Sequence, residues 1–204
     1  MHIAIIGTGN VGGALAQGLA RAGHRVRLGV RDLENFKGKH LLDTAGISAH
    51  PVEEAVSASE VIVLAAPAQA ADVVARSLGD VSGKVVIDTM NGVFMRPEGF
   101  ANTTDAVLAN CNTTDVVKCF NSTGFENMLD PRYGNQSADM FVAGDSTRGK
   151  QVAVQLAHDL GFGKTWDFGG LDKVSLLEQF ALCWINLAIM QKHGRGIAFK
   201  VLER

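Results

Sequence analysis

The chain has 204 residues, of which 47% are apolar, which is enough for one domain or for one domain with a helical appendage. Its formal net charge of −2 and its isoelectric point near 6.3 give no electrostatic reason to bind nucleic acid or an anionic membrane surface. The three cysteines, Cys111, Cys119 and Cys183, lack metal-site spacing and predict reduced thiols. The first apolar run starts at Ile3, so we expect no signal peptide and a cytoplasmic protein.

Short apolar runs rich in β-branched residues alternate with helix-like segments. The runs are Ile3–Ile6, Val26–Val30, Val61–Ala65, Val85–Ile87, Val116–Phe120 and Met140–Ala143. The helix-like segments are Gly13–Ala22, Leu33–Ala45, Val52–Ala58, Ala70–Leu78 and Arg148–Leu160. Continuously apolar strands are covered on both faces, so this alternation predicts an α/β fold with a doubly wound parallel sheet of the Rossmann type.

The pattern changes after Gly161. A short extended stretch, Thr165–Phe168, is followed by an apolar helix over Leu176–Met190 and a tail, Ile197 to Leu202, that we expect to be packed. The helix is shorter than the roughly 20 residues of a membrane span and carries Glu178, so it predicts a buried helix or a subunit interface. We therefore expect a dinucleotide-binding domain over residues 1–168 and a small C-terminal helical extension over residues 169–204.

The segment Gly7-Thr8-Gly9-Asn10-Val11-Gly12 follows the first predicted strand and opens the first predicted helix. A Gly-x-Gly-x-x-Gly pattern is weak alone, but this strand–loop–helix context makes it specific for dinucleotide binding. The first glycine permits a tight turn, the second lets the backbone approach a pyrophosphate, and the third lets helix and strand pack closely. The pyrophosphate would then lie at the positive N-terminus of the helix.

The end of the second predicted strand indicates which dinucleotide binds. A carboxylate about 20 residues past the glycine loop holds the ribose 2′-hydroxyl of NAD, but this position falls near Val30. Arg31 follows, and a guanidinium suits the 2′-phosphate of NADP. Asp32 leaves an alternative open, because it is either the NAD carboxylate or a helix N-cap. We favour NADP, in the form of NADPH.

A second set of residues follows other predicted strands and should share the same edge of the sheet. Ala65, Ala66, Pro67, Met90 and Asn91 are expected to line the nicotinamide part of the cofactor site, and Asn121 and Ser122 the substrate. Turn formation is an equal alternative for each asparagine alone. No catalytic side chain and no metal site are predicted, because hydride transfer between two bound rings needs proximity and orientation rather than a protein nucleophile.

These segments together resemble a family. Gly7–Gly12, Gly29-Val30-Arg31, Val63–Ala70 and Val116–Met128 are similar to the deazaflavin (coenzyme F420) dependent NADP oxidoreductases, and also to the soluble NADPH domain of membrane metalloreductases. The resemblance covers nearly the whole chain. It implies an NADP site in which Val30 and Arg31 hold the 2′-phosphate, a flavin or coenzyme F420 as the hydride acceptor, and a homodimer built on Leu176–Met190.

Two departures from that family concern specificity. Val30 stands where the family has a serine, and Asn121 stands where the archaeal deazaflavin enzymes carry a histidine. Two other classes remain as alternatives. The β-hydroxyacid dehydrogenases share the glycine loop but need a large helical second domain, for which too few residues follow the core. A module that senses NADP(H) without turnover would equally lack acid–base residues.

Overall fold

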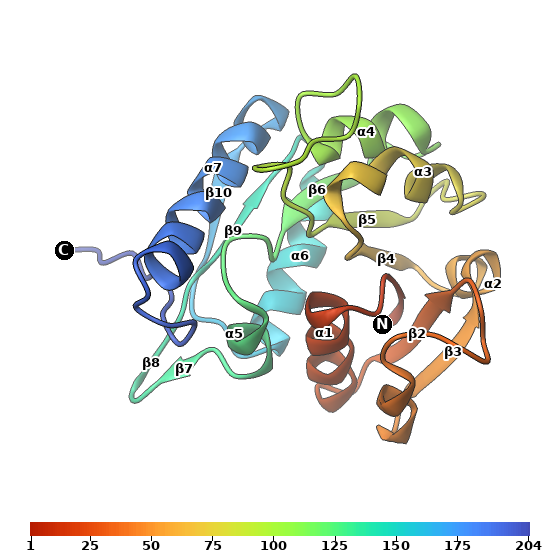
Figure 1. The fold of residues 1–204 in the computed structure, drawn as a ribbon, viewed down its shortest axis with the longest axis horizontal. Coiled ribbons are helices and arrows are strands. Elements are labelled where there is room, and N and C mark those ends of the chain that lie inside the picture. The colour runs from red at the N-terminus through yellow and green to blue at the C-terminus, as the bar shows by residue number, and fades with distance from the viewer.

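The computed structural model describes all 204 residues and contains one eight-stranded sheet with the order β10-β9-β6-β5-β4-β1-β2-β3 (Figure 1). Its strands are β1 (His2–Ile6), β2 (Arg25–Val30), β3 (Ile47–Pro51), β4 (Val61–Leu64), β5 (Val85–Asp88), β6 (Val116–Cys119), β9 (Met140–Ala143) and β10 (Thr165–Gly169). All neighbours pair in parallel except β6 and β9, which are antiparallel. The Rossmann-type α/β prediction is confirmed, and the expectation of a wholly parallel sheet is corrected at β9.

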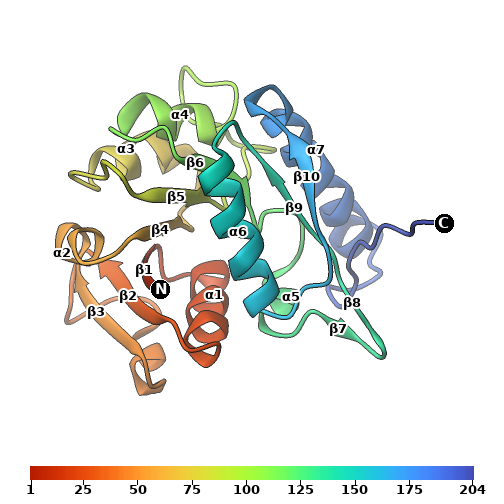
Figure 2. The same cartoon turned by 180° about the vertical axis from the view of Figure 1, so that it is seen from behind.

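Helices cover both faces of the sheet. They are α1 (Asn10–Arg21), α2 (Val52–Ser57), α3 (Ala71–Arg76), α4 (Thr103–Asn110), α5 (Phe125–Leu129), α6 (Thr147–Asp159) and α7 (Val174–Ile185). The largest core cluster joins one sheet face to α1, α5 and α6, and a second cluster joins the other face to α2, α3 and α4 (Figures 1 and 2). In the central strands β1, β4 and β5, alternate residues enter opposite clusters, as a two-sided sheet requires.

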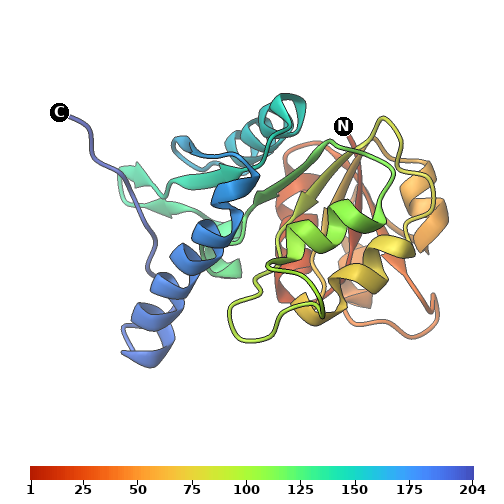
Figure 3. The same ribbon diagram turned by 90° about the horizontal axis from the view of Figure 1, so that it is seen from above.

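Helix α7 covers the antiparallel end of the sheet, where Phe141 and Ala143 of β9 pack on Val174 and Leu177. Figure 3 shows α7 beside the loop that joins β5 to α4, on the side of the molecule away from α2. The helical run Leu171–Met190 passes a length and hydropathy test for a membrane span, with a third of its most apolar window buried. A single such helix is weak support for a span, because core helices pass the same test.

The tail after α7 is packed only in its first half: Ile197, Ala198 and Phe199 are half-buried, whereas Val201 and Leu202 are exposed, which corrects the expectation of a packed tail through Leu202. The backbone oxygen of Ile197 accepts hydrogen bonds from the indole of Trp184 (2.6 Å) and from Asn127 Nδ2 (2.8 Å). The buried Asp139 accepts one from the backbone N–H of Val201. Burial by itself raises the pKa of Asp139, but hydrogen bonds, the largest from Trp166, outweigh it and hold that pKa below its ordinary value. This contribution to stability is therefore lost as pH falls through the lowered pKa.

One local prediction was wrong and several elements were missed. The helix expected over Leu33–Ala45 is a loop followed by one 3-10 turn, η1 (Lys39–Asp43), because Gly38 has a left-handed φ of 92° and Asp32 Oδ1 accepts hydrogen bonds from Glu34 N and Asn35 N. The structure also contains elements that the apolar pattern did not reveal: β3, α4, α5 and a hairpin of β7 (Arg132–Tyr133) and β8 (Gln136–Ser137).

Lys192 offers a test of backbone strain at the end of the C-terminal helix. It is exposed and has a φ of 60°, a conformation that costs an L-residue energy but that glycine adopts freely. Lys192→Gly should raise the free energy of unfolding by roughly 0.5–1 kcal/mol, less than the full strain because glycine is also more flexible when unfolded. Gln191→Gly is the control: Gln191 has a φ of −86°, and the substitution should lower stability in the same denaturant titration.

Candidate dinucleotide and hydride-transfer site

The glycine loop has the shape that anion binding requires. Gly7 has a φ of 104°, and a Cβ there would lie 2.4 Å from the backbone oxygen of Ala65. A Cβ on Gly12 would lie 1.9 Å from the backbone oxygen of Gly7, so α1 and β1 approach too closely for a side chain. A Cβ on Gly9 would meet nothing within 4 Å, which leaves space for a ligand over the start of the helix. The geometry at Gly7 and Gly12 is that of a tight turn and of close packing, and the role of Gly9 toward a pyrophosphate stays a prediction.

The N-terminus of α1 is itself free to bind an anion. No side chain caps the helix at Gly9, and its first turn contains no acidic residue. The first intrahelical acceptor, the oxygen of Gly9, is used by Gly13 N at 2.8 Å, so the N–H groups of Asn10, Val11 and Gly12 have no helical partner. Unpaired amides at a positive helix end fit the pyrophosphate of a dinucleotide.

Arg31 lies at the carboxyl end of β2, next to this loop in the order of the sheet. Its side chain is exposed and makes no hydrogen bond or ion pair within the chain, so its guanidinium is free to meet a phosphate. Val30 is buried in the core, with only 6% of its surface exposed. Asp32 Oδ1 accepts hydrogen bonds from the backbone of the loop of residues 32–35. This carboxylate therefore has a structural role that requires no bound nucleotide.

The sheet order places the remaining predicted residues in a row. From β2 to β6 the strands run β2, β1, β4, β5, β6, so Arg31, the glycine loop, Ala65, Asn91 and Asn121 follow one another along a single edge. The ends of β4 and β5 are joined by Thr89, whose N–H and hydroxyl both donate to the backbone oxygen of Leu64 at 3.1 and 2.8 Å. A dinucleotide bound in extended form along this edge would pass from Arg31 to the two asparagines.

Asn91 and Asn121 are bonded to each other. Asn91 Nδ2 donates to the backbone oxygen of Asn121 at 2.8 Å, and Asn121 Nδ2 donates to Asn91 Oδ1 at 2.9 Å and to the backbone oxygen of Leu177 at 3.3 Å. Asn121 Oδ1 is buried and has no donor within the chain. A buried acceptor without a donor is rare, and at the edge of a ligand site it fits a ligand N–H or O–H group.

The residue before Asn121 is held in an uncommon conformation. Phe120 has a φ of 59° although it is a bulky residue, and its side chain is 1% exposed in the core beside Phe162. Bulky residues with positive φ are outliers, and such strain is found where a functional backbone must be held in place. Here the strain turns the chain immediately after β6, at the point where Asn121 meets Asn91.

Three predicted residues point into the protein rather than into the open edge. The side chain of Met90 lies in the second core cluster, Val30 lies in the first, and the hydroxyl of Ser122 faces the sulfur of Met140. Ala65 and Ala66 are half-buried and Pro67 is exposed. Met90 and Ser122 can therefore contribute backbone atoms or packing to the site. Asn121 is equally buried, at 4% exposed, and its amide is turned toward Asn91 and the backbone of Leu177.

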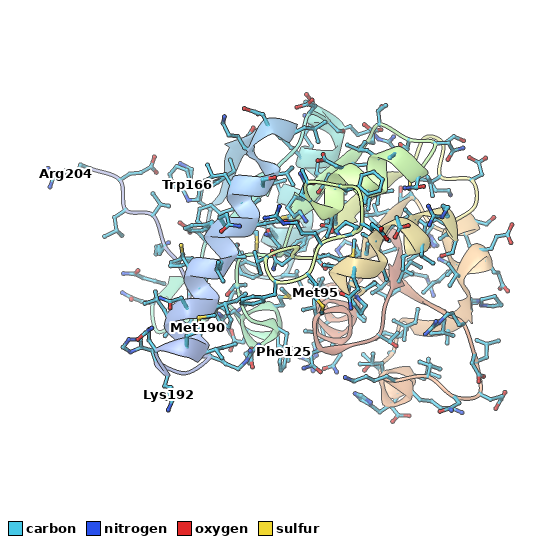
Figure 4. All side chains as sticks on the ribbon, turned by 45° about the horizontal axis from the view of Figure 1, so that its top comes forward. Met95, Phe125, Trp166, Met190, Lys192 and Arg204 are labelled. Atoms are coloured by element: carbon cyan, nitrogen blue, oxygen red, sulfur yellow. The ribbon has the colours of Figure 1, made fainter.

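The loop between β5 and α4 adds apolar side chains beside this edge. Phe94 and Met95 are 65% and 60% exposed, and Met95 is labelled in Figure 4. The loop begins at Asn91 and ends at Asn102, whose side chain caps α4 by accepting from Asp105 N at 2.9 Å. The backbone at both ends of the loop is therefore held while Phe94 and Met95 face solvent.

A buried charge cluster, not predicted from the sequence, lies behind the asparagines. Lys118 lies 2.8 Å from both Asp88 Oδ2 and Glu178 Oε1, and all three side chains are at least 96% buried. Burial raises the pKa of the nearby Asp105, and the Glu178 charge adds to that rise against a lowering hydrogen bond from Asn102. The available signal was a lysine within a continuously apolar strand, Val116-Val117-Lys118-Cys119, because a charge buried on a two-sided sheet requires a partner.

The site is that of a dinucleotide-binding protein of the Rossmann type, with an open helix N-terminus, a free arginine on the neighbouring strand and a polar pair farther along the same edge.

Comparison with known proteins is more specific. Residues 2–92 match the family model described as NADP oxidoreductase, coenzyme F420-dependent. The F420-dependent NADP reductase of Methanothermobacter thermautotrophicus is 31% identical, over 94% of this chain and 91% of that protein. The corresponding protein of Methanocaldococcus jannaschii is 25% identical over the full length of both. The chain belongs to the F420-dependent NADP oxidoreductase family.

Solved structures agree on the fold. A protein from Arthrobacter sp. FB24, described as a candidate F420-dependent NADP reductase, superposes with a TM-score of 0.86 over all of both chains at 22% identity. An imine reductase from Streptomyces aurantiacus has a TM-score of 0.67 at 19% identity, and 93% of this chain covers 63% of that longer chain. At these identities the likeness concerns the fold alone.

Proposed function

We propose that this NADP-dependent oxidoreductase transfers a hydride between NADP(H) and a deazaflavin acceptor of the coenzyme F420 type. Membership of the family supports the NADP-dependent oxidoreductase class, and the reductases of both archaeal relatives are named for F420. The observation that carries the proposal is the single sheet edge on which an anion site, a free arginine and a polar pair follow one another. A flavin is the second acceptor class to be tested, because Asn121 departs from the archaeal pattern.

Each part of the edge has a separate role in this proposal. The amides of Gly7 to Gly12 hold the pyrophosphate and Arg31 holds the 2′-phosphate. The segments Ala65–Pro67 and Thr89–Asn91 place the nicotinamide against backbone, and Asn121 faces the acceptor. The unpaired Asn121 Oδ1 accepts a hydrogen bond from an N–H or O–H of a bound ring.

The proposed reaction needs no protein nucleophile. One hydride, which carries two electrons and one proton, leaves the reduced nicotinamide and bonds to the acceptor ring, and the acceptor takes one further proton from solvent. The protein contributes by holding the two rings in contact and in the correct orientation, which is the main contribution of a protein to cofactor-based hydride transfer.

Three predictions concern the protein as a whole. The exposed apolar side chains of the last helix, Leu176, Leu187, Ile189 and Met190, support the prediction of a homodimer that buries this helix. Sedimentation or light scattering measures the mass directly. A cytoplasmic location and the division at residues 168 and 169 likewise remain predictions.

The experiment that tests the function is anaerobic oxidation of NADPH followed by its absorbance, with coenzyme F420, FMN, FAD and riboflavin offered in turn. Fast turnover with coenzyme F420 and slow turnover with the flavins is the expected result. Fast turnover with one flavin alone would identify that flavin as the acceptor in place of the deazaflavin. Tight NADPH binding without turnover by any of the four would favour an NADP(H) sensor instead.

A further inference from the structure

A buried lysine connects three parts of the chain beside the proposed hydride-transfer site. The side chain of Lys118 is fully buried, and its ammonium group lies 2.8 Å from both Asp88 Oδ2 and Glu178 Oε1. It also donates to the backbone oxygen of Met90 at 2.7 Å and to the hydroxyl of Thr103. One side chain of β6 thus bonds the end of β5, the start of α4 and the middle of α7.

Stability does not account for this cluster. Removing charges from water costs energy that a buried ion pair recovers only in part, so apolar side chains of similar volume often hold a core together as well or better. The cost is greater here because two carboxylates face one ammonium. The ion pairs fix the relative position of the segments, because hydrogen bonds have defined distances and angles. Apolar contacts alone would allow these segments to shift relative to one another.

The segments fixed in this way are those that carry the site. Met90, whose backbone oxygen accepts from Lys118, precedes Asn91, and Asn91 is bonded to Asn121 in both directions. On α7, the backbone oxygen of Leu177 accepts from Asn121 Nδ2, and the next residue, Glu178, pairs with Lys118. Two consecutive residues of α7 are therefore bonded to the two ends of the segment from Lys118 to Asn121.

We propose that Lys118 and Glu178 are positioning residues for hydride transfer. Their ion pair holds α7 against the sheet and thereby fixes the spacing of Asn91 and Asn121 at the acceptor end of the edge. The proposal rests on the proposed function, and it makes the C-terminal helix a part of the site rather than an appendage to it.

Glu178→Met is the variant that tests this role. It leaves Asp88 and Lys118 as a neutral buried pair, whereas removing Lys118 would leave two carboxylates facing each other. The kcat/KM for the acceptor should fall by about tenfold or more while the Kd for NADPH changes by less than about twofold, because displacement of reacting groups by about an ångström is costly and the glycine loop lies on other strands. Glu178→Gln keeps an oxygen that accepts from Lys118 and should retain most of the activity.

Asp115→Asn is the matched control at the opposite end of β6. Asp115 pairs with Arg148 at 2.9 Å and accepts from Ser146 at 2.6 Å, so this variant should lower the Tm without changing kcat/KM. Equal losses in the Met and Gln variants of Glu178, a parallel loss of NADPH affinity, or an unchanged kcat/KM in Glu178→Met would each overturn the proposal.

Amide hydrogen exchange tests the positioning role without any acceptor. In Glu178→Met, residues 91–101 and the helix 174–185 should exchange faster than in the wild type, while residues 7–13 exchange at the same rate. Faster exchange confined to these segments, together with a wild-type protein that turns over none of the acceptors, would support the positioning role and refute the proposed function. Unchanged exchange would refute the positioning role whatever the turnover.

Discussion

Gly12→Ala should abolish NADPH binding and lower the free energy of unfolding by about 3 kcal/mol, the upper part of the range for an added buried methylene. The new Cβ would lie 1.9 Å from the backbone oxygen of Gly7 and 3.3 Å from Ala65 Cβ. Because the first of these is backbone, no side-chain rotation relieves the contact. The helix must move away from β1, which displaces the amides that hold the pyrophosphate. Denaturant unfolding and a fluorescence titration with NADPH measure the two effects.

Substitutions at two neighbouring glycines distinguish the effect on stability from the effect on NADPH binding. A Cβ on Gly13 meets only the side chain of Leu41, at 3.6 Å from Cδ1 and 3.9 Å from Cδ2, so Gly13→Ala should leave stability equal to the wild type or slightly above it. Gly9→Ala should weaken NADPH binding, because its Cβ enters the open space over the helix N-terminus, and should lower stability by no more than about 1 kcal/mol, because alanine is a poorer N-cap than glycine. If Gly12→Ala bound NADPH with wild-type affinity, the glycine loop would not be the pyrophosphate site.

Arg31→Glu should weaken NADPH binding by about a hundredfold or more, because it replaces charge-assisted hydrogen bonds to the 2′-phosphate with repulsion. NADH lacks that phosphate, so its affinity should change little, and the preference between the two cofactors should invert or vanish. Arg31 makes no hydrogen bond or ion pair within the chain, so the substitution should leave stability unchanged. Parallel titrations with NADPH and NADH give the ratio of the two dissociation constants.

The control for this substitution is an arginine on the same strand. Arg25 lies at the first residue of β2, exposed at the opposite edge of the sheet. Arg25→Glu changes the net charge by the same amount, so a general electrostatic effect would weaken NADPH binding in both variants. Unchanged NADPH affinity in Arg31→Glu would refute the assignment of this arginine to the 2′-phosphate. It would favour the alternative in which Asp32 binds the ribose of NAD.

Local patterns made much of this fold predictable. The strands from Ile3 to Ile6 and from Val26 to Val30 were placed within a residue of their observed bounds, because continuous β-branched runs between turns have few alternatives. The glycine loop was predictable because its backbone geometry demands residues without a Cβ. The strand Ile47–Pro51 was not predictable in this way, since only Ile47 is buried on this edge strand and the strand includes the polar Ser48 and His50.

The acceptor side of the site depends on long-range contacts that no local pattern encodes. The strand pattern predicts Asn91 and Asn121 at one edge, but it does not predict their hydrogen bonds to each other or the bond to Leu177, which is 56 residues from Asn121. Glu178 lies 60 residues from Lys118 and was interpreted as a polar residue on an apolar helix. The antiparallel β9 was equally hidden, because strand direction depends on the path of the connecting chain.

The accessibility of the thiols has a practical consequence. Burial raises the pKa of Cys119 to about 12 and that of Cys111 to about 11, so neither thiol will react readily near neutral pH. Cys183 is the one exposed thiol, and it lies on α7 five residues after Glu178. The reaction of Cys183 with a maleimide fluorophore therefore reports whether this helix is open to solvent, as in a monomer, or covered, as in the predicted homodimer.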